Sequence, residues 1–405
     1  MAKFNNVNED KKRKILLIGT VPPEVGSYNY GGVARVVWRL ANALKEQNIN
    51  FCVGAIGKYF KSYQEKNNIK IYGISFSLNS LISTIWVFLS KYHWSSARFS
   101  LRHYIKLFHA IYFLNSIKRK ISFDIIHVHH VINQIPLAAK LLNLDVKIVA
   151  TIHSYTSLLK DNNRREIDNI NMQLRCVHHL THVSKHLRYV GISKGIKWKC
   201  EDEIIYNGIK IYSLEKAKSN NQICFVGTVS KAKGIEKLIS SLKYINRKNL
   251  RLIVIGKGAY IDNIKEKKEQ FPNDVKLLGQ LNHTQALKAM AESQVLVNPS
   301  KSESFGLVYL EALSVGTPVI GYGPILREFK EYLEIKGEIK KWVVEFDFKK
   351  ENSKDLARKI SNSLQIKTLN YCLDKKQELI KGKIKEKLCW DKITANYINI
   401  YKKIG

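Results

Sequence analysis

The sequence predicts an α/β protein of two domains, each with a parallel sheet covered by helices on both faces. Short apolar segments of strand length alternate with stretches in which apolar residues recur at helical spacing. This alternation occurs twice, and a polar stretch at residues 207–221 separates the two series. A chain of 405 residues also has room for two or three domains of about 150 residues.

The first series begins at Lys14, where an apolar run to Gly19 predicts a strand. A loop to Gly31-Gly32 follows, and apolar residues then recur at helical spacing as far as Leu44. We interpret this series as an amino-terminal domain at residues 14–208, preceded by a polar, flexible tail at residues 1–13. Four further apolar runs predict strands at residues 51–55, 69–73, 125–129 and 147–152.

The second series begins with an apolar run at residues 223–226, followed by a glycine-containing loop at residues 227–234. An apolar stripe from Ile235 to Ile245 then predicts a helix. We interpret this series as a carboxyl-terminal domain at residues 209–388. Its further strands are predicted at residues 252–256, 275–279, 295–298 and 318–321.

Charge is the most unusual bulk property, because the chain has a net charge of +33 and its amino-terminal half is the more basic. Such an excess favours an anionic partner, which could be nucleic acid, an anionic membrane surface or a phosphorylated substrate. The alternative is a lysine-rich and asparagine-rich composition with no functional meaning. Nucleic acid is the least expected partner, because the chain lacks a recognisable nucleic-acid-binding motif.

The segment at residues 77–120 mixes aromatic, apolar and basic residues and is predicted to be an insertion in the first domain. Glu65 is the single acid among residues 58–120, against 11 Lys and Arg residues. The apolar run from Leu78 to Leu89 is shorter than the ~20 residues that span a bilayer. We therefore expect a surface that lies on anionic lipid headgroups. A packed insertion with a solvated basic face is the alternative.

The strongest chemical signal lies at residues 299–320, which follow a predicted strand and contain a predicted helix at residues 306–315. Near Ser304, the start of this helix offers free N–H groups and a dipole to an anion. Glu303 stands at the edge of that site, and Glu311 follows eight residues later. Because a phosphate would repel these carboxylates, they are better suited to binding sugar hydroxyls.

This segment resembles a known family. The pattern P-S-x-x-E-x-F-G-x-x-x-x-E-A followed by G-x-P-V is similar to the E-x(7)-E element of family-four retaining glycosyltransferases, which are glycosyl transferases of group 1. The resemblance implies the GT-B fold, with two facing Rossmann-like domains and a last helix, at residues 389–405, that crosses back to the first domain. It implies that Glu311 binds the donor ribose and that Glu303 contacts the donor sugar in catalysis. It also places Ser304, Phe305, Gly306 and Leu307 at the donor.

The loop at residues 227–234 resembles the family's G-R-x-x-x-x-K-G element, whose basic residues clamp the donor diphosphate. Gly227 and Lys233 match this element, whereas Thr228 stands where the arginine is expected. The second clamp is then supplied by Lys231, or by Arg35 of the first domain, or donor affinity is reduced.

In the first domain, Gly31-Gly32 resembles the family's paired glycines, which let the backbone approach the diphosphate and the acceptor. We assign Gly32 to the donor, and Tyr28, Tyr30 and Gly31 to the acceptor, with ordinary loop packing as the alternative. His153 ends a predicted strand and is similar to the family histidine that lies against the donor sugar. We expect a catalytic group that acts by position and electrostatics, with a structural buried histidine as the alternative.

A metal site is not expected. His127 and His129 share one face of a predicted strand and could form a ligand pair, but no third ligand at suitable spacing accompanies them. The family has a similar D-x-x-H-x-H stretch that binds no metal. We therefore expect no cofactor, and the nucleotide sugar is a substrate.

The resemblance implies retaining transfer of a sugar from a nucleotide sugar, and we expect the receiving hydroxyl to belong to a growing cell-surface glycan. The acceptor is expected to be a glycan or lipid-linked oligosaccharide of lipopolysaccharide, O-antigen or capsule type. Six scattered cysteines and a polar amino terminus favour a cytoplasmic protein, peripheral on the inner face of the membrane. The alternatives are a nucleotide-sugar epimerase or phosphorylase on the same fold, or a catalytically impaired glycan-binding homologue.

Overall fold

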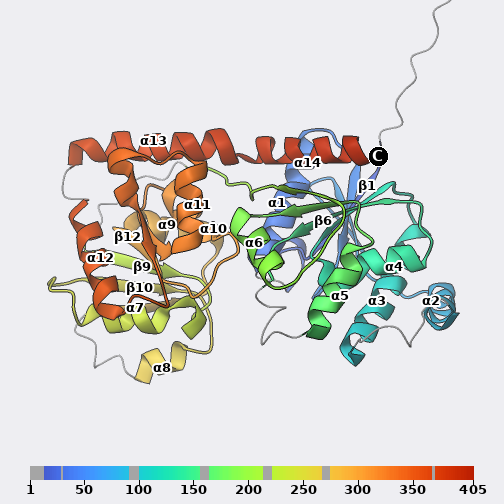
Figure 1. Cartoon of the computed structure of the whole chain (residues 1–405), viewed down its shortest axis with the longest axis horizontal. Helices are drawn as coiled ribbons and strands as arrows, with labels where there is room; N and C mark the ends of the chain where they lie inside the picture. The colour runs from blue at the N-terminus through green and yellow to red at the C-terminus, as the bar shows by residue number, and fades with distance from the viewer. Residues whose placement is uncertain are drawn as a thin grey trace, which may run out of the picture. The chain divides into compact units, whose positions relative to one another are not determined.

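The computed structural model describes residues 13–28, 31–90, 100–155, 164–212, 221–266, 274–366 and 370–405. The chain divides into two compact units. Unit 1 comprises Met1–Tyr206 and Trp390–Gly405, and Unit 2 comprises Asn207–Cys389. Each unit has a sheet of mainly parallel strands with helices packed on it (Figure 1), which confirms the predicted α/β class.

The sheet of Unit 1 has eight strands in the order β3-β4-β2-β1-β5-β6-β7-β8. All neighbouring strands are parallel except β3 and β4, which form an antiparallel edge hairpin. The edge strands β3 and β8 were not predicted, because neither contains a run of apolar residues. Every second residue of each strand is exposed. The strands are β1 (Ile15–Gly19), β2 (Phe51–Ala55), β3 (Tyr63–Lys66), β4 (Ile69–Tyr72), β5 (Ile125–His129), β6 (Lys147–Ile152), β7 (His179–His182) and β8 (Glu201–Ile204).

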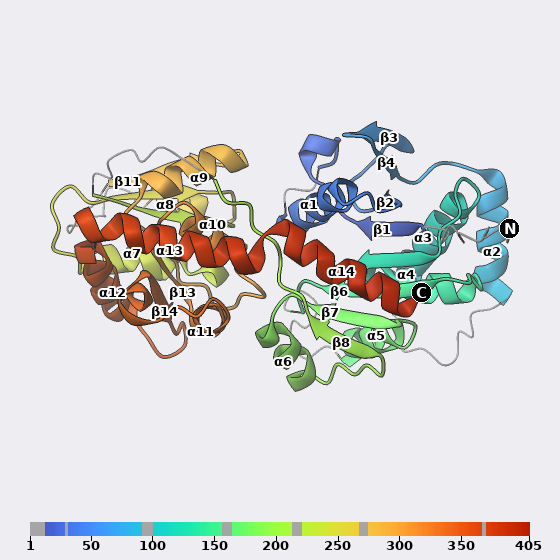
Figure 2. The ribbon, with the colours of Figure 1, turned by 90° about the horizontal axis from the view of Figure 1, so that it is seen from above.

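Helix α1 buries its apolar stripe on this sheet, and its Val37, Leu40 and Leu44 are fully buried. The last helix, α14, packs beside α1 (Figure 2), and Gln47 Nε2 donates to the carbonyl of Asp391 at 3.2 Å. The helices are α1 (Gly32–Glu46), α2 (Leu78–Ser90), α3 (Leu101–Lys118), α4 (Ile135–Leu141), α5 (Arg164–Leu174), α6 (Lys185–Ser193) and α14 (Trp390–Ile404).

The sheet of Unit 2 has six parallel strands in the order β11-β10-β9-β12-β13-β14. Its core consists of buried hydrophobic side chains, most of them from the strands and from α7 and α12. The strands are β9 (Gln222–Val226), β10 (Arg251–Ile255), β11 (Asp274–Gly279), β12 (Val295–Asn298), β13 (Val319–Tyr322) and β14 (Val343–Phe346). The helices are α7 (Ile235–Leu242), α8 (Ile261–Glu266), α9 (His283–Glu292), α10 (Leu307–Ser314), α11 (Gly323–Tyr332), α12 (Ser353–Ile366) and α13 (Asn370–Leu388).

Each sheet has a point where the strand order reverses. In Unit 1 the chain builds outward from β1 on one side and from β5 on the other, and in Unit 2 the same reversal lies between β9 and β12. Open α/β sheets bind ligands at the carboxyl ends of the strands that flank such a point. The loops that follow β1, β5, β9 and β12 are therefore the places to look for a site.

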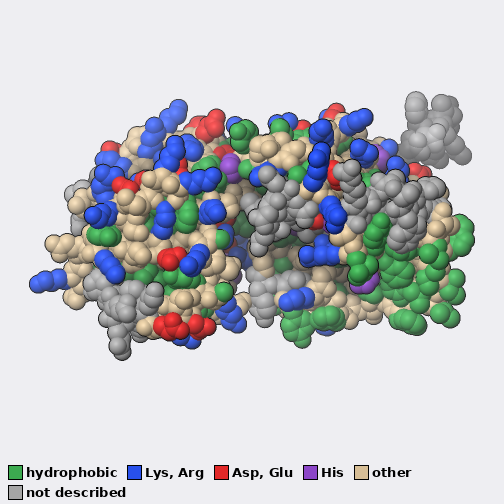
Figure 3. All heavy atoms as spheres, turned by 60° about the horizontal axis from the view of Figure 1, so that its bottom comes forward, with side chains coloured by type: hydrophobic (Ala, Val, Ile, Leu, Met, Phe, Trp, Pro, Cys, Tyr) green, Lys and Arg blue, Asp and Glu red, His purple; other side chains and the backbone are tan. Residues whose placement is uncertain are grey.

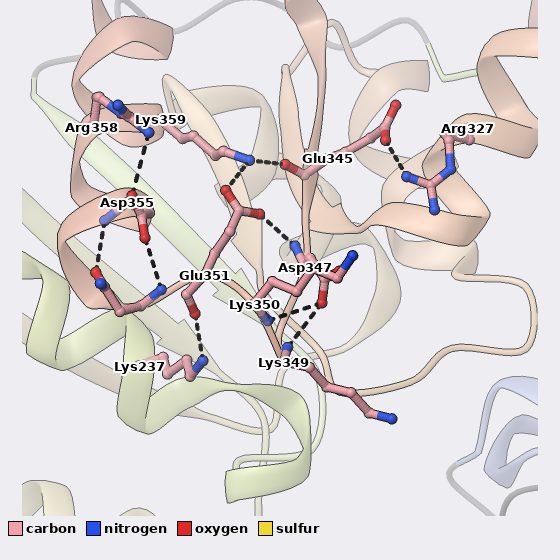
Figure 4. Close-up of polar contacts among 11 residues, drawn as sticks. Lys237, Arg327, Glu345, Asp347, Lys349, Lys350, Glu351, Asp355, Arg358 and Lys359 are labelled. Atoms are coloured by element: carbon pink, nitrogen blue, oxygen red, sulfur yellow. Dashed lines mark hydrogen bonds and ion pairs between the residues drawn. The ribbon is translucent and has the colours of Figure 1, made fainter.

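A network of charged side chains fastens the loop that follows β14 to its neighbours (Figure 4). Lys359 pairs with Glu351 at 2.5 Å, and Lys237 donates to the carbonyl of the same Glu351 at 2.7 Å. Glu345 pairs with Arg327 at 2.6 Å and with Lys330 at 3.0 Å. These charges satisfy one another, so we assign this network to the architecture of Unit 2.

Candidate functional site

The reversal point of Unit 2 is closed by the side chain of Asn298 at the end of β12. Its Oδ1 accepts from Val226 N at 3.2 Å, and its Nδ2 donates to Val226 O at 2.7 Å. The amide thus continues the pairing between β9 and β12 beyond their last paired residues, Cys224 and Leu296. As a result, the loops that leave the two strands start side by side.

The loop after β9 is held against the loop after β12 by its backbone. Lys301 N donates to Ala232 O at 2.8 Å. Gly234 has φ +78°, and a Cβ there would lie 2.1 Å from the carbonyl oxygen of Pro299. This position therefore requires glycine for two reasons, its backbone conformation and the close approach of the second loop.

Lys233 and Glu303 form the central charged contact of this region. Lys233 Nζ donates to Glu303 Oε1 at 2.6 Å, and Ser300 Oγ donates to the same oxygen at 2.8 Å. The side chains are 31% and 11% exposed, respectively, so a carboxylate and an ammonium group are held at the surface with reduced solvation. Such an ammonium group is suited to binding a diphosphate, and the carboxylate to binding sugar hydroxyls.

Glu311 forms a second partly buried pair, with His283. His283 Nε2 lies 3.0 Å from Glu311 Oε1, and the side chains are 21% and 13% exposed. The ring of Tyr212 stands edge-on to His283, with 5.7 Å between ring centroids. His283 and Tyr212 were not among the predicted site residues, because nothing in the local sequence relates them to Glu311.

The start of α10 differs in detail from the prediction. The helix begins at Leu307 and ends at Ser314, and Gly306 precedes it with φ +70°. The ring of Phe305 is buried against Phe329, so its backbone alone could meet a ligand. Ser304 and Leu307 are partly exposed.

Tyr309 is a structural residue of this site that the sequence did not reveal. Its hydroxyl donates to Asn298 O at 2.9 Å and accepts from Tyr322 N at 3.0 Å. Burial raises the pKa of this phenol well above its usual value, and the nearby Glu303 carboxylate acts in the same direction. Tyr309 therefore stays neutral and joins the ends of β12 and β13.

The candidates for the second diphosphate clamp differ in exposure. The Thr228 side chain is exposed, next to Gly227 at the end of β9. Lys231, one of the candidates, is 71% exposed and lies 3.6 Å from Glu236. Arg35, the other, is partly buried on α1 of Unit 1.

His153 of Unit 1 belongs to a stack of histidines at the carboxyl ends of β5 and β6. His153 Nε2 and His129 Nδ1 are hydrogen-bonded at 2.8 Å, and their rings are stacked with centroids 5.1 Å apart. His130 stands edge-on to His153 and has φ +79°, an uncommon value for a residue with a side chain. Burial lowers the pKa of His130 to about 4 and that of His129 and His153 well below their ordinary value. These imidazoles are therefore neutral near pH 7.

Deeper in the sheet, His127 is held by both ring nitrogens. Nδ1 lies 2.6 Å from the hydroxyl of Tyr401, and Nε2 lies 2.7 Å from Thr151 Oγ1. Thr151 in turn contacts Thr181 Oγ1 at 2.7 Å and the hydroxyl of Tyr397 at 3.3 Å. This row fastens α14 to the sheet and occupies the nitrogens that a metal would need. In the described part of the chain, no group of three or more His, Cys, Asp or Glu side chains could hold a metal ion.

The loop after β1 carries the predicted acceptor contacts. Tyr28 is 62% exposed, and its ring lies 5.9 Å from that of Phe60. Gly31 is the N-cap of α1, Gly32 is the first residue of that helix, and a Cβ at Gly31 would meet nothing within 4 Å. Packing therefore does not explain the glycine at position 31. Tyr30 lies outside the described residues.

Both units match known sequence families. Residues 209–381 match the glycosyl transferases group 1, and residues 30–211 match Glycosyltransferase Family 4. An uncharacterized glycosyltransferase of Methanocaldococcus jannaschii is 28% identical over 262 residues, which cover 59% of this chain and 71% of that protein. A second uncharacterized glycosyltransferase of Methanocaldococcus jannaschii is matched over 63% of its length, and the glycogen synthase of Thermotoga maritima over 42%.

Solved structures extend the likeness to nearly the whole chain. HepE from Anabaena, in complex with UDP and glucose, superposes with a TM-score of 0.66 at 16% identity, covering 96% of this chain and 100% of that one. The lipopolysaccharide outer core galactosyltransferase WaaB superposes with a TM-score of 0.64 at 18% identity, covering 96% and 99%. At such identities the likeness concerns the fold.

Proposed function

We propose that this chain transfers a sugar from a nucleotide sugar to a hydroxyl of a growing cell-surface glycan, with retention of configuration. The chain belongs to the group 1 and family 4 glycosyltransferases, which have the GT-B fold. The observation that carries the proposal is the partly buried Lys233–Glu303 pair at the reversal point of Unit 2. It presents a cation and a carboxylate where open sheets of this class bind ligands.

Unit 2 holds the donor in this proposal. Lys233 binds the diphosphate and stabilises the negative charge that grows on it as the sugar leaves. Glu303 contacts the hydroxyls of the sugar, and Glu311 those of the ribose. Both carboxylates already have hydrogen-bond donors, Ser300 and Lys233 for Glu303 and His283 for Glu311. Those partners orient the carboxylates before the substrate arrives, which reduces the reorganisation that binding requires.

Transfer with retention needs one bond made and one broken on the same face of the sugar. The acceptor oxygen bonds to the anomeric carbon as the bond from that carbon to the diphosphate oxygen breaks. The departing phosphate oxygen takes the acceptor proton, so no separate base is required. His153 of Unit 1 stays neutral at neutral pH and serves as a positioning group.

No metal is required in this proposal, because Lys233 and the N–H groups at the start of α10 supply the positive potential that the leaving diphosphate needs. Full transfer rates after dialysis against a chelator, with no gain on adding Mg²⁺ or Mn²⁺, are the expected result. A chelator that stops transfer, with recovery on adding metal, would contradict this part of the proposal.

The acceptor is proposed to be a lipid-linked glycan of lipopolysaccharide, O-antigen or capsule type, extended at the cytoplasmic face of the membrane. Two observations support it, the basic character of the amino-terminal half and the likeness in fold to a lipopolysaccharide galactosyltransferase. A lipid-linked substrate keeps its reactive end near a membrane surface, so an enzyme that extends it gains from working there.

A thermal-shift screen of nucleotides and nucleotide sugars tests the donor site first. A nucleotide that binds only the folded protein at a hundred times its Kd stabilises it by ~2.7 kcal/mol and raises the unfolding midpoint. Incubating the best donor with lipid-linked acceptors then separates the candidate activities. Transfer requires both substrates, whereas an epimerase acts without an acceptor and a phosphorylase acts with phosphate. Nucleotide binding without turnover would identify a catalytically impaired homologue.

A further inference from the structure

Helix α2 of Unit 1 packs against α3 with its polar side. Ser80, Thr84 and Val87 are its buried residues. Thr84 Oγ1 donates to Ser80 O at 2.6 Å and accepts from Asn115 Nδ2 of α3 at 3.1 Å. A helix that merely covers a domain turns its apolar stripe inward. In α2 two hydroxyl side chains occupy that stripe, and a hydrogen bond to Asn115 fixes the orientation.

The opposite side of α2 exposes large apolar side chains. Leu78, Ile82, Trp86 and Leu89 recur at helical spacing and are between 57% and 64% exposed. The start of α3 continues this surface with Leu101 and Ile105, which are 75% and 50% exposed. Figure 3 shows hydrophobic side chains gathered in one area where α2 and α3 lie. We call these six residues the α2 face.

Basic groups accompany the α2 face, and the one acid that the structure places against the start of α3 among the described contacts is Glu166 of α5, which lies 2.5 Å from His103. Helix α2 contains no charged residue, and the sequence has no Asp or Glu between Glu65 and Asp124. At the amino-terminal end of α2, Arg119 donates to Asn79 O at 3.0 Å and Lys120 donates to Ser75 Oγ at 2.9 Å. Arg102, next to Leu101, is exposed. The apolar surface is therefore bordered by positive charge.

We propose that the α2 face inserts into the interfacial layer of an anionic membrane, with Arg102, Arg119 and Lys120 against lipid phosphates. An uncharged helix with one apolar side and basic neighbours suits a helix that lies in the plane of the interface. Among the described helices, none is long and apolar enough to cross a bilayer. The proposal deepens the proposed function, because it names the surface that brings the enzyme to a lipid-linked acceptor.

Charge favours a membrane over a second copy of this chain as the occupant. A symmetric dimer through the α2 face would bring the basic residues of two copies together with no acid on this stretch to offset them. Two copies of a chain with a net charge of +33 also repel each other. An anionic bilayer offers hydrocarbon to the six apolar side chains and phosphates to their basic neighbours.

The test is flotation of the full-length protein with vesicles of phosphatidylglycerol and phosphatidylcholine. We expect binding that weakens with added salt and is much weaker on pure phosphatidylcholine. The double variant Ile82→Gln and Trp86→Gln should bind at least roughly tenfold more weakly, because burying such side chains supplies much of the interfacial affinity. Both positions are exposed, so the variant should keep the wild-type unfolding midpoint.

A matched control comes from α6 of the same unit. Tyr189 and Ile192 are 68% and 50% exposed, and Tyr189→Gln with Ile192→Gln should leave vesicle binding unchanged. Equal losses in both double variants, or wild-type protein that does not float, would overturn the proposal. So would a wild-type dimer that the α2 variant converts to a monomer in light scattering. Transfer to a short water-soluble acceptor should be unchanged by the α2 substitutions. If the wild-type protein transfers no sugar to such an acceptor, that result would count against the proposed function instead.

Discussion

Both units place polar side chains at the ends of parallel strands, but those of Unit 2 are charged and those of Unit 1 are neutral. In Unit 2, Lys233 and Glu303 are charged side chains that remain partly exposed, and each finds its partner across 70 residues of sequence. In Unit 1, His129, His130 and His153 are packed together, and burial keeps them neutral. In the proposed function, Unit 2 uses its charged pair to bind the donor, whereas the histidines of Unit 1 stay neutral and His153 acts through its position.

The physical reason for this difference is solvation. A charge at the surface keeps part of its hydration, so a pair such as Lys233–Glu303 can exchange one partner for a diphosphate or a sugar hydroxyl at moderate cost. A proton added to one of the stacked histidines would create a charge that loses its hydration and opposes the protonation of its neighbours. Substitutions of Lys233 and Glu303 should therefore act mainly on substrates, and those of His129 and His130 mainly on stability.

The largest effect is expected for Lys233→Ala. Removing the ammonium group takes away a charge aimed at the leaving diphosphate, and loss of one such group typically slows turnover ~100-fold to 1,000-fold. Steady-state kinetics with the donor found in the nucleotide screen would measure it. Lys265→Ala is a suitable control, because Lys265 is 64% exposed on α8 and its Nζ lies 3.5 Å from Asp262 Oδ1, one turn away. A Lys233→Ala enzyme with near-normal turnover would contradict the donor-site assignment.

Glu311→Gln should cost less, roughly tenfold to 100-fold in donor affinity, because it weakens hydrogen bonds made by a charged acceptor. The effect should depend on the ribose. Wild-type protein should prefer a ribonucleotide to its 2′-deoxy form in a calorimetric titration, and Glu311→Gln should lose most of that preference. The same substitution at Glu378, which is 73% exposed on α13, serves as the control. An unchanged preference would remove Glu311 from the ribose site.

The histidine stack should make Unit 1 sensitive to acid. Burial lowers the pKa of His127 to about 3 and that of His130 to about 4, while an unfolded histidine titrates near ~6.5. Between those values the unfolded chain binds more protons, so stability is complete above about pH 6.5 and falls as the pH decreases. Each such histidine contributes about 1.4 kcal/mol of stability lost per pH unit within this window.

Urea unfolding at a series of pH values would measure this dependence. His130→Asn removes one of the titrating groups, and asparagine tolerates a positive φ better than most residues. The variant should therefore lose less stability than wild type on acidification, while transfer activity at neutral pH changes little. Parallel curves for the two proteins would show that the pKa of His130 is not lowered in the folded state.

The smallest effect is expected from Thr228→Arg, which restores the residue that the resemblance leads one to expect. Thr228 is exposed, so an arginine can be accommodated without repacking the core. If the second diphosphate clamp is missing, the donor should bind several-fold more tightly, which corresponds to about 1 kcal/mol for an added surface charge pair. No change, combined with weaker binding in Lys231→Ala, would show instead that Lys231 already supplies the clamp.

Much of the fold followed from local patterns in the sequence. Buried parallel strands are short continuous apolar runs, so β1, β2, β5, β6, β9, β10 and β12 could be located directly. The edge strands β3 and β8 could not, because half of their residues face solvent and resemble loops in composition. Position in the chain also put Lys233 and Glu303 on loops that follow strands.

Tertiary structure decided which side chains meet. His127 and Tyr401 are 274 residues apart, and no local pattern relates a strand residue to a residue of the last helix. The pairs of Glu303 with Lys233 and of Glu311 with His283 likewise depend on how separate loops meet at the reversal point of the sheet.

Helix α2 shows most clearly which properties the sequence determines and which depend on tertiary packing. Its sequence alone determined that it is apolar, uncharged and too short to span a bilayer. Only packing against α3 decided that Ser80 and Thr84 turn inward and that Trp86 turns outward. Composition specifies how much apolar surface a helix has, but the direction in which that surface points is set by its neighbours.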